Sequence, residues 1–517
     1  MFSAELKEKF SKKTICVYAT LALIVLSALI LRLWLVSGHH LIFFYDQARD
    51  AVHANNIANG DLMIFGPSAS GTNDTFYHGA IWYYFLAPWY AISADPQNAV
   101  NALVVLSSLY LVVIFYLAKK ILKSPTGALI VTILMAFSSL VTTNVTWISN
   151  PSLVYFFFPP FIYFAYRYWQ KMSLWHFILT ALFLGLLIQA AISQAYWGIL
   201  LIIIFVRHFR EPGKWKTLVA GGATLLLSTS SMILVQALLI KRGILTFQGL
   251  RDFNTKPITT SLNDALLGIL NVYGTTLARS LFPAFLVASF LLIVVMLIWY
   301  CRKKTSNRNF FLVVGAVPLI FLTIVFRNSP HSLAGFEFVL YLVLIDLAIA
   351  LKKSWGIKIV LSVSLLIFIV MNSYQLFSVR EHRSYLNSIQ KGVVLADQLE
   401  LIDETYRRAA YQPFTFSANT VPSFVNVTWH YLYSWYGKEK YGYTPIFIGP
   451  SQLGYPHYGL IEETENYVLP YATHFTIMEP DTGLDPRLET KFLEEQYRLA
   501  GTPSAGIRFS ELQLLVY

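Results

Sequence analysis

The stretch Ile15–Val36, ICVYATLALIVLSALILRLWLV, is followed closely by the polar stretch Phe43-Phe44-Tyr45-Asp46-Gln47-Ala48-Arg49-Asp50. A helix that crosses a bilayer needs roughly 20 mainly apolar residues, and the first stretch meets that requirement. Four lysines precede it and no small-residue cleavage site follows, so we expect a retained anchor and not a signal peptide. The second stretch is the first long polar break in the chain.

The composition of the whole chain is that of a polytopic membrane protein. Of its 517 residues, 56% are apolar and only 13% are charged, and the mean hydropathy is +0.54. Soluble domains carry about 25% charged residues. The net charge of +11 comes mostly from short loops between apolar runs, which membrane topology explains without nucleic acid. With only Cys16 and Cys301, neither a disulfide framework nor a thiolate metal site is indicated.

Apolar runs long enough to suggest spanning helices recur along most of the chain. They predict a mostly α-helical protein with about 11 transmembrane helices. The runs lie near residues 15–36, 99–118, 127–146, 151–167, 174–191, 195–206, 217–239, 281–300, 310–326, 333–351 and 356–372.

The basic residues predict the orientation of these helices. If the N-terminus is cytoplasmic, every inner loop is rich in Lys and Arg, as the positive-inside rule requires. We therefore expect a multi-pass protein of the cell membrane. Residues 1–376 would form the membrane domain, with a first outer loop at 37–98. Residues 377–517 would form an extracytoplasmic domain.

The segment after about Arg380 is more charged, and its apolar runs are short. It predicts a small α/β domain with two helices and five strands, the last two of which form a hairpin. The expected helices are Gly392–Ala410 and Pro486–Leu499, and the expected strands are Phe414–Ser417, Pro445–Ile448, Phe475–Met478 and Gly506–Phe509, the last paired with Leu512–Tyr517.

The first outer loop opens with a segment of helical character. From Asp46 to Asn59 the charged side chains Asp46, Arg49, Asp50 and His53 fall on one helix face, and Gly60 is placed to end the helix. An acid in the first turn is favoured by the helix dipole and stays ionised. Such a carboxylate can act as a general base towards a hydroxyl. The alternative is an N-capping Asp on a solvated face.

Several other polar residues are candidates for binding, each with a simpler alternative. His78 and Asn150 lie at outer turns, where aromatic belts also occur. Arg32, inside the first apolar run, is a candidate for binding a lipid phosphate, although such residues often simply extend to the interface. Arg279, Arg327 and His331 are outer cations near span ends, and together they can bind a phosphate whose lipid tail lies in the bilayer. Singly, each is explained as a surface cation.

The motifs that would supply chemical energy or a metal are missing. The sequence holds no phosphate-cradling P-loop, no H-E-x-x-H and no dense Cys/His cluster. ATP is therefore not expected to drive a reaction on the outer face. A sugar linked to a lipid phosphate meets the requirement, because its leaving group is already activated.

The order of short motifs in the first outer loop resembles the membrane glycosyltransferases of the GT-C fold. The likeness is to bacterial relatives of the protein O-mannosyltransferases and of the lipid A aminoarabinose transferase. That family has an acidic pair at the start of the loop, then Gly-Asp, a Gly-Pro-like turn and a Lys/His-Gly/Pro motif. The matching segments here are Tyr45-Asp46-Gln47-Ala48-Arg49-Asp50, Gly60-Asp61, Gly66-Pro67, Tyr77-His78-Gly79-Ala80 and Tyr83-Tyr84-Phe85-Leu86-Ala87-Pro88.

The resemblance implies inverting transfer of a sugar from a polyprenyl-phosphate donor to an acceptor hydroxyl. Asp46 matches the catalytic first acid and Gln47 replaces the second, unless Asp50 takes that role. Arg49 matches a basic position, and His78-Gly79 stands where some relatives have Lys-Pro. Outer-side cations would stabilise the leaving lipid phosphate. A monophosphate donor does not obviously require a divalent metal, so no cofactor is predicted.

The sequence leaves the acceptor open among protein, lipid and glycan, which includes the activity of an oligosaccharide ligase. Two other classes of function also remain. One is a flippase or transporter of lipid-linked glycan, which buried charges in the spans would favour; only Glu337 and Asp346 stand out there. The other is a membrane anchor that presents the C-terminal domain, which leaves the polar face of the first loop unexplained.

Overall fold

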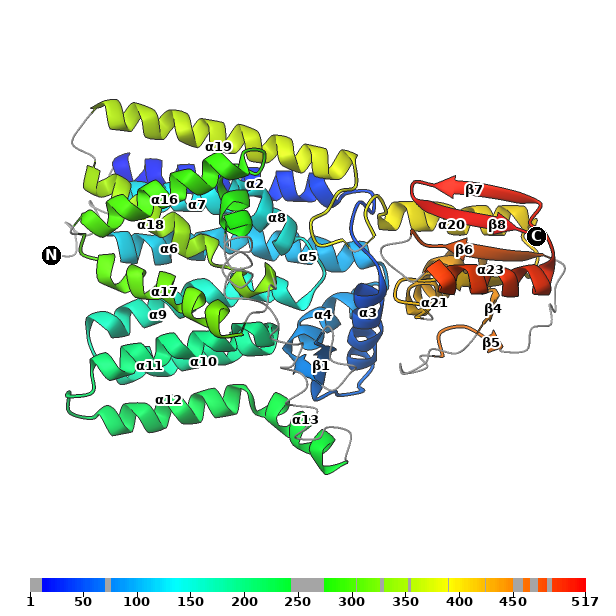
Figure 1. Cartoon of the computed structure of the whole chain (residues 1–517), viewed down its shortest axis with the longest axis horizontal. Helices are drawn as coiled ribbons and strands as arrows, with labels where there is room; N and C mark the ends of the chain where they lie inside the picture. The colour runs from blue at the N-terminus through cyan, green and yellow to red at the C-terminus, as the bar shows by residue number, and fades with distance from the viewer. Residues whose placement is uncertain are drawn as a thin grey trace.

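A bundle of long helices is joined end-on to a smaller sheet domain in the computed structural model (Figure 1). The structure describes residues 12–69, 76–242, 274–303, 305–325, 330–351, 355–388, 390–423, 425–449, 459–464, 473–480 and 486–517. The first half of the bundle contains α2 (Lys12–Val36), α3 (Tyr45–Ala58), α4 (Ile81–Ile92), α5 (Pro96–Leu109), α6 (Leu111–Leu122), α7 (Pro125–Phe137), α8 (Ser139–Val145), η1 (Asn150–Leu153), α9 (Val154–Gln170) and α10 (Leu174–Ala190).

The second half continues the bundle and returns to α2. Its elements are η2 (Ile192–Trp197), α11 (Gly198–Arg207), α12 (Lys214–Ser228), α13 (Ser230–Lys241), a helix at Gly274–Leu281, α16 (Leu286–Arg302), α17 (Arg308–Val325), η3 (Pro330–Leu333), α18 (Glu337–Leu351) and α19 (Trp355–Glu381). Every apolar run predicted from the sequence falls on one or two of these helices.

The predicted count of about 11 spans is not confirmed. Among the described residues, three helices are long and apolar enough to cross a membrane: Thr14–Val36, Pro96–Leu122 and Lys358–Glu381. The number rises to six if each of three sharply bent helix pairs forms one span. Breaks account for part of the difference, because α7 and α8 meet at 64°, α12 and α13 at 63°, and Gly274–Leu281 and α16 at 97°. Another part comes from apolar helices of only 10–17 residues, such as Leu174–Ala190.

The C-terminal sheet domain has the predicted α/β character. A six-stranded sheet has the order β5-β4-β3-β6-β8-β7, in which β5, β4, β3 and β6 are parallel and the β7–β8 hairpin is antiparallel. Its strands are β3 (Thr415–Asn419), β4 (Ile446–Ile448), β5 (Glu463–Thr464), β6 (His474–Met478), β7 (Ala505–Phe509) and β8 (Leu512–Val516). Its helices are α20 (Leu395–Arg408), α21 (Val427–Leu432), η4 (Tyr433–Gly437), α22 (Lys438–Tyr441) and α23 (Pro486–Ala500). The domain boundary at residues 376 and 377 stays a prediction.

The sheet domain is fixed to the chain segment between α2 and α3. The backbone N–H groups of Leu395 and Ala396 donate to Leu41 O and His39 O, at 2.9 and 3.1 Å. The Tyr431 ring of α21 packs against Phe43, with ring centroids 5.5 Å apart. The start of α3 is therefore held between the helical bundle and the sheet domain.

Candidate functional site

The start of α3 is set by the side chain of Gln47. Phe44 precedes the helix in an extended conformation, and its N–H donates to Gln47 Oε1 at 3.1 Å. The amide of the same side chain donates to Ile148 O, also at 3.1 Å. Gln47 thus satisfies an otherwise unpaired group at the helix start and ties α3 to the turn before η1.

Four side chains form a continuous polar chain that runs from the interior to the surface. Trp82 Nε1 donates to Asp50 Oδ2 at 2.7 Å, and Arg49 Nε and Nη2 donate to Asp50 Oδ1 at 3.0 and 2.8 Å. Arg49 Nη1 then lies 2.9 Å from Asp46 Oδ1. We call Trp82, Asp50, Arg49 and Asp46 the Asp46 charge chain. Only its last member is open, since the exposed side-chain fractions are 1% for Asp50, 7% for Arg49 and 43% for Asp46.

Burial and neighbouring charges shift the pKa values in the Asp46 charge chain in opposite directions. Burial raises the pKa of Asp50 to about 6, although the Arg49 guanidinium and the Trp82 N–H both favour its carboxylate. Conversely, the carboxylates of Asp50 and Asp46 raise the pKa of Arg49 despite its burial. Arg49 therefore stays charged and holds one oxygen of Asp46, and the half-exposed carboxylate remains open to other partners.

His53, the fourth predicted member of the polar face, is on the inner side of α3. Its ring packs 4.9 Å from that of Tyr83 and 5.8 Å from that of Phe65. Burial, with the nearby Arg49 charge, lowers the pKa of His53 to about 4. The ring is thus neutral at physiological pH and belongs to the packing beneath the site.

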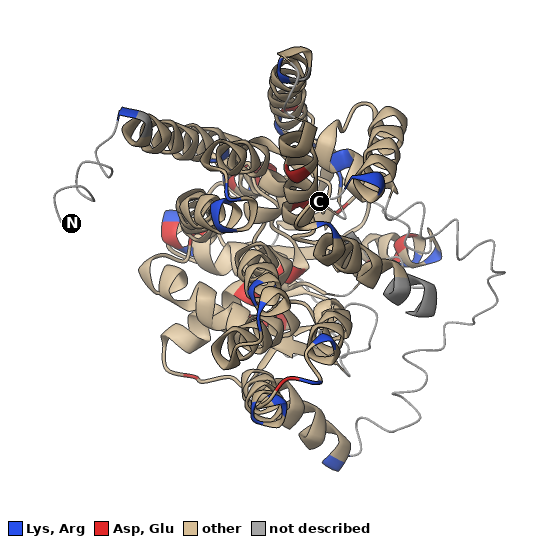
Figure 2. Ribbon diagram, turned by 90° about the vertical axis from the view of Figure 1, so that its left-hand side faces the viewer, with Lys and Arg blue, Asp and Glu red and all other residues tan. Residues whose placement is uncertain are grey.

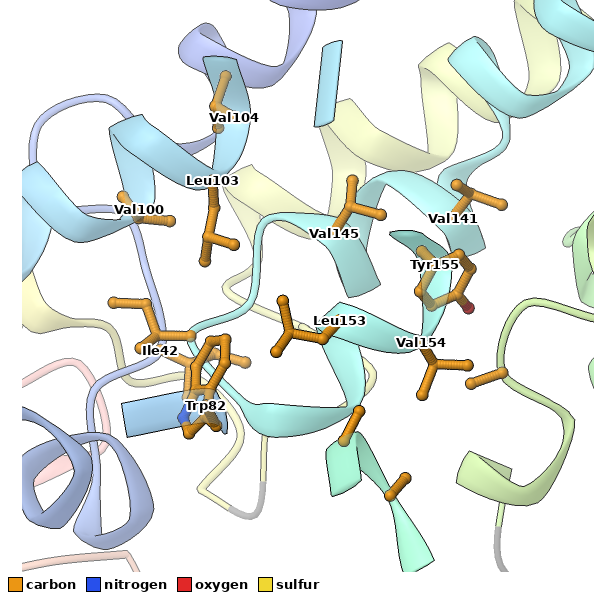
Figure 3. Close-up of a cluster of buried hydrophobic side chains, with 14 of the residues drawn as sticks. Ile42, Trp82, Val100, Leu103, Val104, Val141, Val145, Leu153, Val154 and Tyr155 are labelled. Atoms are coloured by element: carbon orange, nitrogen blue, oxygen red, sulfur yellow. The ribbon is translucent and has the colours of Figure 1, made fainter. Parts of the chain in front are cut away.

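A dry apolar cluster supports the Asp46 charge chain from below. Figure 3 shows the indole of Trp82 beside Ile42, with Leu153 and Leu103 near them. These residues come from four segments: the α2–α3 link, α4, α5 and η1. The cluster fixes the indole that orients Asp50, and it excludes water from the inner end of the chain.

His78 and Asn150 are brought to a second place, at the end of α10. Asn150 Nδ2 donates to Ala190 O at 2.5 Å, and Ile192 N donates to His78 Nδ1 at 3.1 Å. His78 belongs to β2 (Tyr77–Gly79), which pairs antiparallel with β1 (Phe65–Ser68). Both predicted binding residues therefore contact backbone groups around the α10–η2 junction.

The glycines of the loop motifs are explained by close backbone approach. A Cβ on Gly66 would lie 2.1 Å from Gly79 O across the β1–β2 pair, and a Cβ on Gly79 would lie 2.4 Å from Gln189 Oε1. Gly60 has φ +103° and follows the end of α3, as predicted for a helix stop. The β1–β2 pair itself was not predicted.

The four predicted lipid-phosphate residues lie in different environments. Arg32 is buried within the bundle, where it donates to Ser107 Oγ at 3.1 Å and to Met135 O at 3.4 Å. Arg279 is half-buried on the helix Gly274–Leu281. His331 lies in η3, and nothing is described of its side chain, whereas Arg327 lies outside the described residues.

Sequence reasoning missed Trp82 and the roles of Gln47 and Asn144. Trp82 sits in an apolar run that carries no polar signal. Asn144 Oδ1 accepts from Asn387 Nδ2 at 3.0 Å, which links α8 to the segment after α19. In the described ranges, no group of three or more His, Cys, Asp or Glu is placed to hold a metal ion.

A bundle with a polar first loop and an end-on sheet domain defines a class of fold, that of the GT-C membrane glycosyltransferases. The solved structure of ArnT from Cupriavidus metallidurans bound to undecaprenyl phosphate matches with a TM-score of 0.57 and 11% identity. The match covers 96% of this chain and 97% of that one. ArnT in the apo state matches over the same shares, with a TM-score of 0.47 and 12% identity. No family model and no curated protein matches the chain.

The likeness confirms the fold that the resemblance in the loop motifs implied. ArnT is the lipid A aminoarabinose transferase, a GT-C glycosyltransferase. In the described part of this chain, three helices, or up to six with the bent pairs, are long and apolar enough to cross a membrane, as in a multi-pass membrane protein.

Proposed function

We propose that this protein is an integral-membrane glycosyltransferase. It moves a sugar from a polyprenyl-phosphate donor to an acceptor hydroxyl, with inversion at the anomeric carbon. Asp46 is its general base. The reaction takes place outside the cytoplasm, and the N-terminus of the chain lies inside.

One observation supports this proposal above the others. On a fold similar to that of ArnT, α3 presents a single half-exposed carboxylate, Asp46, at the open end of a buried charge chain. Arg49 holds one oxygen of this carboxylate, so the side chain is oriented before any ligand binds. A preorganised base needs little rearrangement in the transition state.

The chemistry follows from this arrangement. Asp46 takes the proton of the acceptor hydroxyl as that oxygen attacks the anomeric carbon of the donor sugar. The bond between the anomeric carbon and the phosphate oxygen breaks, and the polyprenyl phosphate leaves with the electron pair. Cations stabilise the negative charge on the leaving phosphate. For this role we propose Arg279, with Arg327, His331 and Arg32. We propose Arg49, Asp50, His78 and Asn150 as the residues that bind the substrate.

The test is sugar transfer from labelled polyprenyl-phosphate sugars by Asp46→Asn in membranes. We expect a rate lower by roughly 100-fold to 10,000-fold, as is typical for loss of a general base. Glu494→Gln is the matched control, because Glu494 is an exposed acid of α23, outside both the charge chain and the loop motifs, and the rate of this variant should stay at the wild-type level. Unchanged transfer by correctly inserted Asp46→Asn would exclude Asp46 as the base.

The same assay separates the enzyme from a transporter. Movement of lipid-linked glycan across the bilayer without sugar transfer would replace our proposal by the flippase. The two acids that stand out within the predicted spans, Glu337 and Asp346, give the transporter function little support. Glu337 accepts from Tyr155 Oη at 3.2 Å, and Asp346 accepts from Tyr300 Oη and Asn307 Nδ2 at 2.9 and 3.0 Å. These bonds give both acids a role in packing the helices.

A further inference from the structure

A basic cavity lies at the end of the bundle opposite the sheet domain, where α6 turns into α7. Its volume is about 320 Å³, and it is lined by Tyr116, Lys119, Lys120, Lys123 and Pro125. Figure 2 looks at this end of the molecule and shows Lys and Arg at the near ends of several helices. The cavity is remote from α3, because α5 and α6 run away from the sheet domain (Figure 1).

The backbone of the turn fixes where these lysines stand. Lys119 and Lys120 occupy the last turn of α6, and Lys123 ends the helix in the left-handed conformation, with φ +52°. Its N–H donates to Lys119 O at 2.9 Å, and the next residue, Ser124, caps α7 by accepting from Gly127 N at 3.1 Å. The three ammonium groups are thus gathered by a short, well-defined turn.

The charge of this cavity is not balanced by the protein. No acid lines it, and within the described part of the chain no carboxylate forms an ion pair with Lys119, Lys120 or Lys123. The helix dipole of α6 favours cations at its end, but it offsets only about half of one charge. Three neighbouring cations around an open cavity attract an anion.

The surface beside the cavity shows what kind of anion fits. An exposed stripe of Val105, Leu109, Val113 and Tyr116 follows one face of α5 and α6, and the same helical spacing continues to Lys120. Pro96–Leu122 is among the helices long and apolar enough to cross a membrane. An apolar stripe that ends in a basic cavity matches a molecule with a hydrocarbon tail and an anionic head.

We propose that the α6–α7 turn binds the phosphate head of an anionic membrane lipid. Lys119, Lys120 and Lys123 contact the phosphate, the Tyr116 hydroxyl lies at the level of the head group, and an acyl chain lies along the stripe. This site is independent of sugar transfer, because none of its residues belongs to the Asp46 charge chain. It attaches one end of the bundle to acidic lipid.

The first test uses the purified full-length chain and native mass spectrometry. The lipids are phosphatidylglycerol and phosphatidylcholine. The variant K119Q/K120Q/K123Q is compared with K171Q/K214Q/K216Q, which removes the same charge from the end of α9 and the start of α12. We expect the first variant to bind phosphatidylglycerol roughly 100-fold more weakly, since each of the three lysines near an acidic surface contributes about fivefold. The second should bind as the wild type does, and neither change should affect phosphatidylcholine.

A second test needs no variant. Lysine acetylation is measured on the wild type in vesicles that contain either phosphatidylglycerol or only phosphatidylcholine. Lys119, Lys120 and Lys123 should be protected severalfold in the first vesicles, whereas added inorganic phosphate should not protect them. Equal labelling in both vesicles, equal weakening in both triple variants, or full protection by inorganic phosphate would overturn the proposal.

Discussion

The two ends of the helical bundle use charged side chains in opposite ways. At the α3 end, Asp50 and Arg49 are buried, of opposite sign and paired at 2.8 Å. At the α6–α7 end, Lys119, Lys120 and Lys123 have the same sign and line an open cavity. Buried pairs fix geometry, because removing one partner leaves an uncompensated charge. Exposed cations act through their field and add little to folding.

The largest expected effect comes from breaking the buried pair. Arg49→Leu should lower the free energy of unfolding by about 3–5 kcal/mol, because it leaves the carboxyl group of Asp50 buried without its counter-charge. The double variant R49L/D50L should recover much of this loss. Thermal unfolding in detergent measures both. A single variant as stable as the wild type would show that the Asp46 charge chain is not formed.

The pH dependence of stability should report on His53. Its pKa is lowered from 6.5 to about 4 in the folded protein. The unfolded chain therefore binds more protons between these values, and His53 makes stability fall as pH drops from about 6.5 to 4, by roughly 3 kcal/mol. The raised pKa of Asp50 acts in the opposite sense over an overlapping range. Comparing thermal unfolding of wild type and His53→Gln isolates the histidine, and identical pH profiles would contradict its burial.

Trp82→Phe tests the inner end of the Asp46 charge chain. It removes a hydrogen bond to a carboxylate, which typically contributes about 1.5–3 kcal/mol, and keeps an aromatic ring in the apolar cluster. Trp89→Phe on the same helix is the control, since the Trp89 Nε1 has no hydrogen-bond partner among the described residues. We expect lower stability and a lower kcat for sugar transfer only in the first variant. Equal losses in both variants would show that the smaller ring, and not the lost hydrogen bond, is responsible.

Gln47→Glu restores the second acid of the family's acidic pair. It tests whether an acid at this position acts in the reaction or only weakens the fold. A carboxylate can still accept from Phe44 N, but it cannot donate to Ile148 O. We expect a loss of roughly 1–3 kcal/mol in thermal unfolding, because the carbonyl loses its partner and faces a negative charge. Faster sugar transfer without loss of stability would instead give the second acid a role in the reaction.

The smallest effect is expected at the other end of the bundle. Lys120→Gln removes an exposed charge with no ion-pair partner in the described ranges, so the unfolding free energy in neutral detergent should change by less than about 0.5 kcal/mol. A loss of unfolding free energy as large as that of Arg49→Leu would show that Lys120 stabilises the fold as Arg49 does, and it would contradict the comparison of the two ends. The same measurement in phosphatidylglycerol should show a larger difference from the wild type.

Much of the helical architecture could be predicted from the sequence because its signals are local. Apolar runs of sufficient length marked the helices. The spacing of Asp46, Arg49 and Asp50, at positions i, i+3 and i+4, predicted that their side chains lie on one face of a helix. The alternation and turn residues of the last segment predicted the β7–β8 hairpin, whose register pairs Phe509 with Leu512. Each of these patterns depends on residues close in the chain.

The predicted count of about 11 spans is not confirmed, for a different reason. Hydropathy does not show where a helix bends, and α7–α8 and α12–α13 break within single apolar runs. The contacts of the site could not be predicted either, because they join residues that are far apart in the sequence. Trp82 reaches Asp50 across 32 residues of sequence, and Gln47 reaches Ile148 across 101. No local pattern joins such positions, because the bonds form only after the helices pack.

The sequence by itself thus determined that this chain is a helical membrane protein with a polar first loop and a small α/β domain at its C-terminal end. Only the tertiary structure decided which carboxylate is open. Asp46 and Asp50 carry the same group one helical turn apart, but Asp50 turns inward to Trp82 and Arg49, and Asp46 remains half-exposed. The physical reason is packing: helix periodicity fixes which side chains share a face, and the neighbouring helices fix which of them reach water.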